Sequence, residues 1–385
     1  MIYLDAQAST PLHPDVTARM IEVLQSDYQA NPHSTHFAGQ QAMKIVDQAR
    51  RDLAQSFGVD FAEVVFTSGA TESNNIALQG VIIEALNDLP SIEVITTPIE
   101  HSAVLEVLSS LQQRYPDRIV IRYLPVSPQG IVQTETLPEH LTDRTVLVSV
   151  MHANNEIGTI QPIKALATQV KNTRGAGKYP LFHSDGSQAV WSEDINLGHT
   201  AVDLYSISGH KCYGPKGVGA LIIRQGTSIG PISYGGGQEY ALRPGTVSPF
   251  LVAGLAKACQ LLQTPEHHQA LKRIRSQRDQ LYDTIISIPN IIVNGDMDAR
   301  LPHNLHLTVP DKTAESLVIA FDLAGIALSA GSACQSGALE PSHVILALNK
   351  TQQAALSSLR ISLHQFINDS DIPIIQQTIT DILTD

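Results

Sequence analysis

Short apolar runs and longer amphipathic stretches alternate along the first part of the chain. The stretch 35–57 repeats apolar residues at helical spacing and is followed by Gly58, which predicts a helix that ends there. The stretch 14–27, with Pro14 in its first turn, predicts another helix. Runs rich in β-branched residues predict buried strands at 63–67, 92–97, 118–124, 145–151, 179–185, 202–208 and 217–224. Buried strands that alternate with helices favour a mostly parallel, seven-stranded sheet that is covered on both faces.

The pattern changes near residue 250. Helical stretches at 250–262 and 265–288 are followed by short strands ("NLHLTV", "SLRISL") and by helices near 313–324 and 370–383. We therefore predict an α/β protein of two domains. The large domain would span residues 16–262, and residues 1–15 and 263–385 would form a smaller α+β domain.

The composition argues against several classes of protein. The 385 residues are 43% hydrophobic and 16% charged, the balance of a globular chain with a large core. The net charge is −12 and no run of lysine and arginine occurs, so we expect no direct nucleic-acid partner. No apolar stretch is long enough to span a bilayer, and the N-terminus lacks the pattern of a secretory signal. We expect a cytoplasmic protein whose three scattered cysteines and scattered histidines form neither a disulfide nor a metal site.

Polar segments lie at the ends of five predicted strands, at 68–73, 100–101, 152–156, 183–188 and 208–211. The carboxyl ends of parallel strands share one edge of a sheet, where ligands bind, so we expect these segments to meet. In "TSGATES" (67–73) a glycine precedes a helix, whose first N–H groups at Ala70 and Thr71 would suit a phosphate. Taken alone, this motif is more typical of an ordinary helix cap.

The segment "SISGHKCYGPKG" (206–217) carries a lysine at a strand end. A desolvated lysine amine forms Schiff bases with carbonyl groups, which makes Lys211 a candidate for covalent catalysis. Ser208 and His210 would hold a phosphate beside it. The alternative is an exposed lysine in a loop, which is what we expect of Lys216.

Asp185 and Gln188 occupy another of these strand ends, in "FHSDGSQAV". A buried carboxylate needs a cationic partner, and a protonated pyridine nitrogen would serve; a solvated turn is the alternative. Gln188 could bond the phenolic oxygen of such a ring, and His101 could stack on it. Together with Lys211, these residues describe a pyridoxal phosphate site.

Longer motifs are spread over nearly the whole chain. They are "YLDAQASTP", "NPHSTHFAG", "VVFTSGATESNN", "EHSAV", "VSVMHANNEIG", "HSDGSQ", "SGHKCYGPKGVGAL", "GGGQE", "RPGT", "SAGSACQSGALEPSHV" and "SLRISL". With these motifs the chain resembles the cysteine desulfurases of the NifS/IscS family, within the class V, fold-type I pyridoxal phosphate enzymes. The S-G-H-K and G-S-A-C elements, in this order, are the most specific.

The resemblance implies a role for each residue of the site. The cofactor would be bound by Ala70, Thr71, His101, Asn155, Asp185, Gln188, Ser208, His210 and Lys211. Thr246 would reach the phosphate of the neighbouring subunit, which implies a homodimer with shared sites. Asn155 and Arg360 would bind the substrate, Arg360 by a bidentate grip on its carboxylate. The catalytic residues would be Lys211, His101 and Cys334.

The implied reaction converts L-cysteine to L-alanine. Lys211 would remove the Cα proton, and the Cys334 thiolate would attack the substrate sulfur and become a persulfide. A sulfur-acceptor protein, such as an iron–sulfur scaffold or a thiolation enzyme, would then take the sulfur. Cys334 lies among small and polar residues that predict a loop, whereas Cys259 and Cys212 are expected to be unreactive, Cys212 by pointing the other way along its strand. Alternatives are a selenocysteine lyase, a cystine C–S lyase, a class V aminotransferase and a non-catalytic sulfur carrier.

Two features depart from the family pattern. "DAQAST" (5–10) differs from the more usual asparagine- or tyrosine-containing version, so we expect an altered substrate edge at the N-terminal segment. The chain ends at Asp385, soon after the last predicted helix, whereas many family members carry a longer tail that docks a scaffold protein. We therefore expect recruitment of that partner to differ.

Overall fold

The computed structural model describes residues 1–27, 30–331 and 340–384. Its main sheet has seven strands in the order β2-β8-β7-β6-β5-β3-β4. Only β8 is reversed in this sheet, pairing antiparallel with both β2 and β7. The strands are β2 (Val64–Thr67), β3 (Ile92–Thr96), β4 (Ile119–Tyr123), β5 (Thr145–Ser149), β6 (Leu181–Asp185), β7 (Leu204–Ser208) and β8 (Gly219–Ile223). The prediction of a mostly parallel seven-stranded sheet is confirmed.

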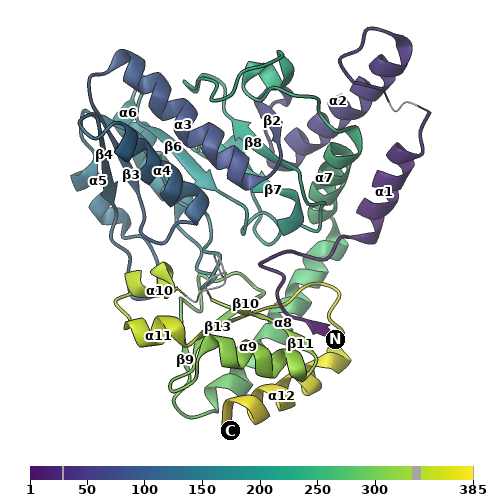
Figure 1. Ribbon diagram of the computed structural model, residues 1–385, viewed down its shortest axis with the longest axis vertical. Helices are drawn as coiled ribbons and strands as arrows, with labels where there is room; N and C mark the ends of the chain where they lie inside the picture. The colour runs from purple at the N-terminus through teal and green to yellow at the C-terminus, as the bar shows by residue number, and fades with distance from the viewer. Residues whose placement is uncertain (28–29, 332–339, 385) are drawn as a thin grey trace.

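Helices cover both faces of this sheet (Figure 1). Successive residues of a strand point to opposite faces, so Leu204 packs into one core and Tyr205 into the other. The helices of the first face are α3 (Ala70–Asp88) and α4 (Ser102–Arg114). Those of the second face are α2 (Phe37–Phe57), α6 (Ile163–Arg174) and α7 (Pro249–Leu262). Because both faces are buried, the strands read in the sequence as continuous apolar runs rather than as alternating ones.

The first two helices show how local chemistry sets helix ends. As predicted, α2 ends at Gly58, whose φ of 63° lies in the left-handed region that favours glycine. In contrast, α1 (Pro14–Leu24) is shorter than the predicted 14–27, because the chain leaves the helix at Gln25. The Ser26 hydroxyl donates to the Val23 carbonyl at 2.8 Å, a local bond that competes with a further helical turn.

A second unit is built around a four-stranded antiparallel sheet in the order β12-β13-β10-β9. The N-terminal strand pairs in parallel with β11 in this unit, so the two ends of the chain lie in the same part of the molecule (Figure 1). The strands are β1 (Ile2–Tyr3), β9 (Ile292–Val293), β10 (Asn304–Thr308), β11 (Ile326–Ala327), β12 (Ser329–Ala330) and β13 (Ser358–Ser362). The remaining helices are α5 (Leu137–His140), α8 (Pro265–Ile286), α9 (Ala314–Leu323), α10 (His343–Ala347), α11 (Gln352–Leu356) and α12 (Ile372–Thr384).

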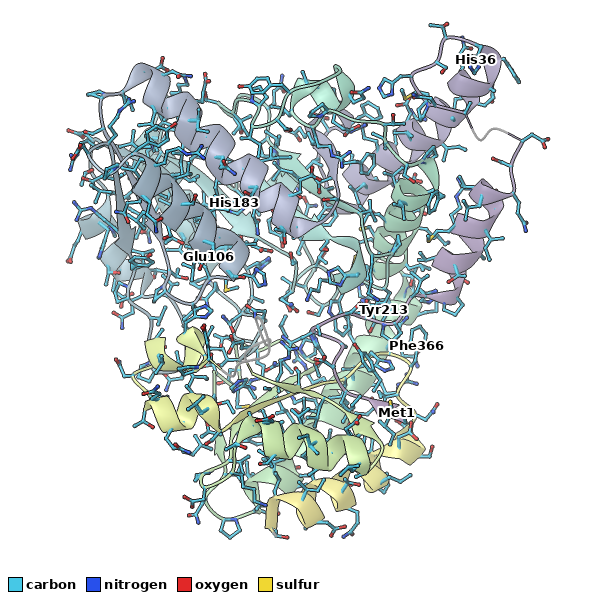
Figure 2. All side chains as sticks on the ribbon, in the orientation of Figure 1. Met1, His36, Glu106, His183, Tyr213 and Phe366 are labelled. Atoms are coloured by element: carbon cyan, nitrogen blue, oxygen red, sulfur yellow. The ribbon has the colours of Figure 1, made fainter. Side chains whose placement is uncertain are left out.

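Side chains from distant parts of the chain meet between the two units of the fold. Tyr213 and Phe366 lie close together at this junction (Figure 2), with ring centroids 5.8 Å apart. We propose, as the sequence predicts, that residues 16–262 form the large domain and that residues 1–15 and 263–385 form the small one.

Within the described ranges, none of the helices combines the length and the apolar character needed to cross a membrane.

Candidate active site

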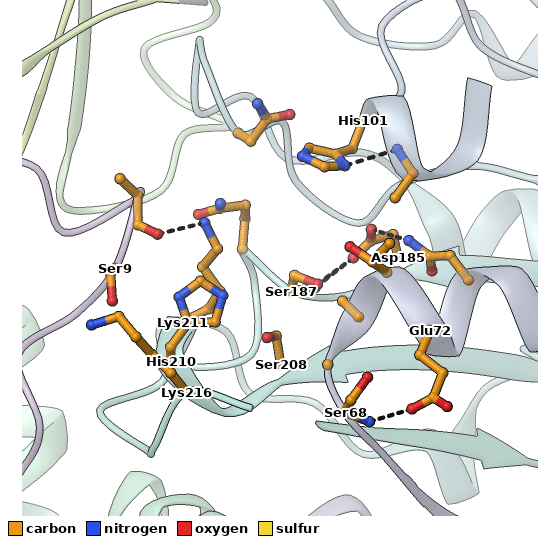
Figure 3. A pocket seen from close by; sticks show the side chains of 18 of the residues that line it. Ser9, Ser68, Glu72, His101, Asp185, Ser187, Ser208, His210, Lys211 and Lys216 are labelled. Atoms are coloured by element: carbon orange, nitrogen blue, oxygen red, sulfur yellow. Dashed lines mark hydrogen bonds between the residues drawn. The ribbon is translucent and has the colours of Figure 1, made fainter. Parts of the chain in front are cut away.

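A cavity of about 510 Å³ lies at the carboxyl ends of the parallel strands. Side chains from several strand ends converge on it, and Ala8 and Ser9 of the N-terminal segment complete its lining (Figure 3). Its volume is within the range of about 300–1,000 Å³ that is typical of small-molecule sites. The predicted cofactor residues that line it are Ala70, Thr71, His101, Asn155, Asp185, Gln188, Ser208, His210 and Lys211.

One end of the cavity is suited to an anion. Helix α3 begins at Ala70, directly after Gly69, so the first N–H groups of the helix lie at the cavity. His210 Nδ1 is buried without a hydrogen-bond partner in the part of the chain that is described. Burial, and then the charges of Lys211 and Lys216, lower the pKa of His210 to about 4. The imidazole is therefore neutral at neutral pH and keeps one N–H to donate to an anion.

Asp185 is held rigidly at the edge of the sheet. Its Oδ1 accepts hydrogen bonds from the Ser187 N–H at 2.9 Å and the Ser187 hydroxyl at 2.6 Å. Its Oδ2 accepts one from Asn74 Nδ2 at 2.7 Å (Figure 3). These three donors fix the orientation of the carboxyl group, which would pair with a protonated ring nitrogen.

The sequence reasoning missed both Ser187 and Asn74, although signals for them exist. Ser187 lies two residues after Asp185, the spacing at which an aspartate bonds its own turn. Asn74 lies one helical turn after Ala70 and therefore on the same face of α3.

His101 caps the N-terminus of α4. Its Nδ1 accepts a hydrogen bond from the Ala103 N–H at 3.0 Å, so in the neutral ring the proton is on Nε2. Burial lowers the pKa of His101, and the nearby Asp185 carboxylate opposes this in part. The neighbouring Glu100 is fully buried, which raises its pKa to about 8. Neutral His101 is thus available both to stack on a ring and to exchange a proton.

Lys211 lies on a short 3-10 turn (Gly209–Lys211) directly after β7. Its Nζ donates to the carbonyl oxygens of Gln7 at 2.5 Å and Ala8 at 3.0 Å. Burial, and then the charge of Arg360, lower the pKa of Lys211 to about 8. A larger fraction of the amine is therefore neutral and nucleophilic near neutral pH than for an exposed lysine.

Two neighbours of Lys211 differ from expectation in detail. Cys212 is buried, but it follows the 3-10 turn rather than lying on a strand, and its Sγ donates to the Gly209 carbonyl at 3.3 Å. Its direction is thus set by the turn and not by strand alternation. Lys216 is exposed, as expected, but it also lines the cavity. No local pattern predicts this, because it depends on where the Gly/Pro loop lies relative to the other segments that line the cavity.

Arg360 on β13 approaches the site from the second unit. Its Nη2 donates to Asp5 Oδ1 at 2.7 Å and to Ser329 Oγ at 2.8 Å, and its Nη1 donates to the Asn155 carbonyl at 2.7 Å. Its Nε is buried with no hydrogen-bond partner among residues 1–27, 30–331 and 340–384. Arg360 thus has a free donor beside Asn155, although it is not one of the described residues that line the cavity. The contribution of Asp5 and Ser329 was not foreseen.

The remaining predicted residues are Gln188, Thr246 and Cys334. Gln188 lines the cavity, but its Nε2 donates to the Gln7 carbonyl at 3.1 Å. Thr246 is exposed just before α7 and is not among the described residues that line the cavity of its own chain, and its contact with a neighbouring subunit stays a prediction. Cys334 lies outside the described residues.

Comparisons with known proteins agree with this geometry. The aminotransferase class-V family model matches residues 2–375. Cysteine desulfurase IscS of Dictyoglomus turgidum is 39% identical over 373 residues, which are 96% of this chain and 91% of that protein. The chain belongs to the cysteine desulfurase family of the class V aminotransferases.

Solved structures agree with this family assignment. A NifS-like protein superposes with a TM-score of 0.90 at 32% identity, covering 100% of this chain and 99% of the other. SspA in complex with cysteine superposes with a TM-score of 0.80 at 30% identity, covering 94% of this chain and 99% of the other. The expected fold class and the resemblance to NifS and IscS are confirmed.

Proposed function

We propose that this protein is a pyridoxal phosphate-dependent cysteine desulfurase that converts L-cysteine to L-alanine. The observation that carries the proposal is the composition of one cavity. It combines Lys211, whose pKa is lowered, the fixed carboxylate of Asp185, and the N-terminus of α3. A nucleophilic amine, an anchor for a ring nitrogen and a phosphate cradle are the three attachments that this cofactor requires.

The residues present fit the cofactor. His210 Nδ1 and Asn155 Oδ1 are buried polar atoms that lack a partner in the described part of the chain, and both belong to residues that line the cavity. Such atoms are costly unless something bonds to them. The α3 N-terminus, Ser208 and His210 would hold the phosphate, Asp185 the ring nitrogen and Lys211 the aldehyde carbon. When bound, the cofactor would supply an electron sink for the bond-breaking steps at the substrate.

The remaining roles fall to side chains around the cavity. Lys211 would carry the proton from the substrate Cα, because its lowered pKa allows both gain and loss of a proton near neutral pH. His101 would serve as a second acid or base. The buried Nε of Arg360 would bind the substrate carboxylate.

We propose that Cys334 receives the sulfur. Its thiolate would attack the sulfur of L-cysteine, and the Cβ–S bond would break. The bonding electrons would remain on Cβ, which would then take up a proton to give L-alanine. The product on the protein is a persulfide. One thiol and one L-cysteine are consumed, and one persulfide and one L-alanine are formed. L-cysteine as the substrate is supported by the similarity to SspA, which was solved with cysteine.

We further propose a homodimer in which Thr246 of each subunit serves the other subunit's site, and a sulfur-acceptor protein as the final partner. The cytoplasmic location stays a prediction, because relatives include a mitochondrial and a mitosomal protein. A selenocysteine lyase or cystine lyase is a less favoured function, since the G-S-A-C element supplies a thiol that a simple lyase does not need.

The test is to measure sulfide and alanine released from L-cysteine in the presence of a reductant. The wild type should release both in equal amounts, and Cys334→Ala should lose sulfide release while it keeps the long-wavelength absorbance of the bound cofactor. Cys259→Ala is the matched control, because Cys259 is buried on α7 and should keep its activity. Full activity of Cys334→Ala would contradict the persulfide proposal, and faster turnover of L-selenocysteine or cystine would favour the lyase.

A further inference from the structure

Gln7, which belongs to the unusual "DAQAST" segment, has hydrogen bonds both to the four-stranded sheet and to residues that follow strands β6 and β7. Only 1% of its surface is exposed. Its N–H donates to Ser362 Oγ on β13 at 3.0 Å, and its side-chain Oε1 accepts from Asn304 Nδ2 on β10 at 2.5 Å. Its backbone carbonyl accepts from Lys211 Nζ at 2.5 Å and from Gln188 Nε2 at 3.1 Å. One residue of the N-terminal segment thus connects the second unit to the candidate catalytic lysine.

Behind Gln7, a chain of buried polar groups fixes its side chain. Asn304 Nδ2 also donates to the Glu156 carbonyl at 2.9 Å, and Asn304 Oδ1 accepts from Arg300 Nη1 at 3.1 Å. Arg300 is buried, and its remaining hydrogen bonds within the described residues go to the backbone carbonyls of Asp296 and Asn294. The charge of Arg300 polarises the Asn304 amide and strengthens its bond to Gln7.

The carbonyl pair at residues 7 and 8 is a good acceptor for an ammonium group. Both oxygens lie within hydrogen-bond distance of Lys211 Nζ, and hydrogen bonds to a charged form stabilise that form. The other charges that act on Lys211 are Arg360, which disfavours the ammonium form, and Asp185 and Asp5, which favour it. The imidazole of His101 also interacts with it, and those of His210 and His101 are largely neutral.

We propose that Gln7 is a positioning residue for Lys211. The carbonyls of Gln7 and Ala8 form the resting site of the Lys211 amine whenever it is not bonded to the cofactor, and the Arg300–Asn304–Gln7 chain holds this site in place. The proposal rests on the proposed role of Lys211 as the cofactor lysine. The role requires a side chain at residue 7 that is long enough to reach Asn304.

The test measures how readily Lys211 is acetylated at different pH values. The full-length chain is freed of cofactor with hydroxylamine and treated with trace acetic anhydride, and labelling of Lys211 is quantified by peptide mass spectrometry. Exposed Lys216 serves as the reference in the same sample. The wild-type Lys211 profile should give an apparent pKa of about 8.

Gln7→Leu keeps the size of the side chain but removes the acceptor for Asn304. Its Lys211 profile should shift down by roughly half to one pH unit, which is about a three- to fivefold rise in neutral amine at pH 7. Gln7→Asn, which is one methylene shorter, should shift in the same direction. Gln7→Glu keeps both length and acceptor and adds a negative charge, so its profile should stay at the wild-type position or move up.

Unchanged Lys211 profiles in folded Gln7→Leu and Gln7→Asn, within about 0.2 unit, would overturn the proposal. Thermal unfolding of each variant establishes that it is folded. If Gln7→Leu does not fold, the result for Gln7→Asn, which is the smaller change, decides the test. The labelling needs neither cofactor nor substrate. An active desulfurase can therefore fail this test, and a protein without desulfurase activity can pass it.

Discussion

The two sides of the cavity are held together in different ways. On the side of the seven-stranded sheet, Asp185 and His101 each have a hydrogen-bond partner two residues away in sequence, Ser187 and Ala103. Lys211 is the exception on this side, because it bonds to the distant carbonyls of Gln7 and Ala8. On the side of the four-stranded sheet, Arg360 is fixed by Asp5, which is 355 residues away in the sequence. Local folding therefore contributes more to the first side, apart from Lys211, whereas the position of Arg360 depends on how distant segments assemble.

This difference matches the division of labour that we propose. A cofactor that stays bound through many turnovers needs a preorganised cradle, which local hydrogen bonds supply. A substrate that enters and leaves is better served by groups whose partners can be exchanged. Arg360 already bonds to Asp5, so a substrate carboxylate has to use the free Nε or compete with Asp5.

The largest effect is expected on the sheet side, from Lys211→Ala. Loss of the amine should abolish the long-wavelength absorbance of the bound cofactor and lower turnover of L-cysteine by at least roughly 10²–10⁴-fold, the usual contribution of a proton-transfer group. Absorbance spectra and sulfide release measure the two effects. Lys216→Ala, on the same loop, is the matched comparison and should keep the absorbance. Loss of the absorbance in Lys216→Ala, but not in Lys211→Ala, would show that Lys216 and not Lys211 has the covalent role.

A smaller effect is expected on the other side, from Arg360→Lys. An ammonium group cannot reproduce the planar, forked donor set of the guanidinium, and hydrogen bonds to charged groups contribute about 1.5–3 kcal/mol. The KM for L-cysteine should therefore rise roughly ten- to a hundredfold, with a smaller change in kcat. Steady-state kinetics with L-cysteine test this, and Asp5→Asn, which weakens the competing ion pair, should lower KM or leave it unchanged. A fall in kcat with KM unchanged would remove Arg360 from substrate binding.

The same contrast explains what the sequence could predict. Lys211 and Asp185 lie at strand ends, and the rule that parallel strands share one binding edge was enough to bring them together. The start of α3 was readable from the glycine before it. Asp5, Gln7 and the packing of the Lys216 loop were not predictable, because they depend on contacts between segments that no local pattern encodes.

The smallest effect is expected from Cys212→Ala. This variant tests whether the sulfur chemistry depends on Cys212 or, as we propose, on Cys334. Cys212 is buried, and its hydrogen bond to Cys259 helps to raise the pKa of the Cys259 thiol. A buried thiol of this kind contributes packing rather than reactivity. Cys212→Ala should lower the free energy of unfolding by about 1 kcal/mol and keep cofactor absorbance and sulfide release. Denaturant unfolding and the desulfurase assay measure these two effects. Loss of sulfide release in a folded, cofactor-bound Cys212→Ala would place the sulfur chemistry on the side of the seven-stranded sheet, which would contradict the proposed role of Cys334.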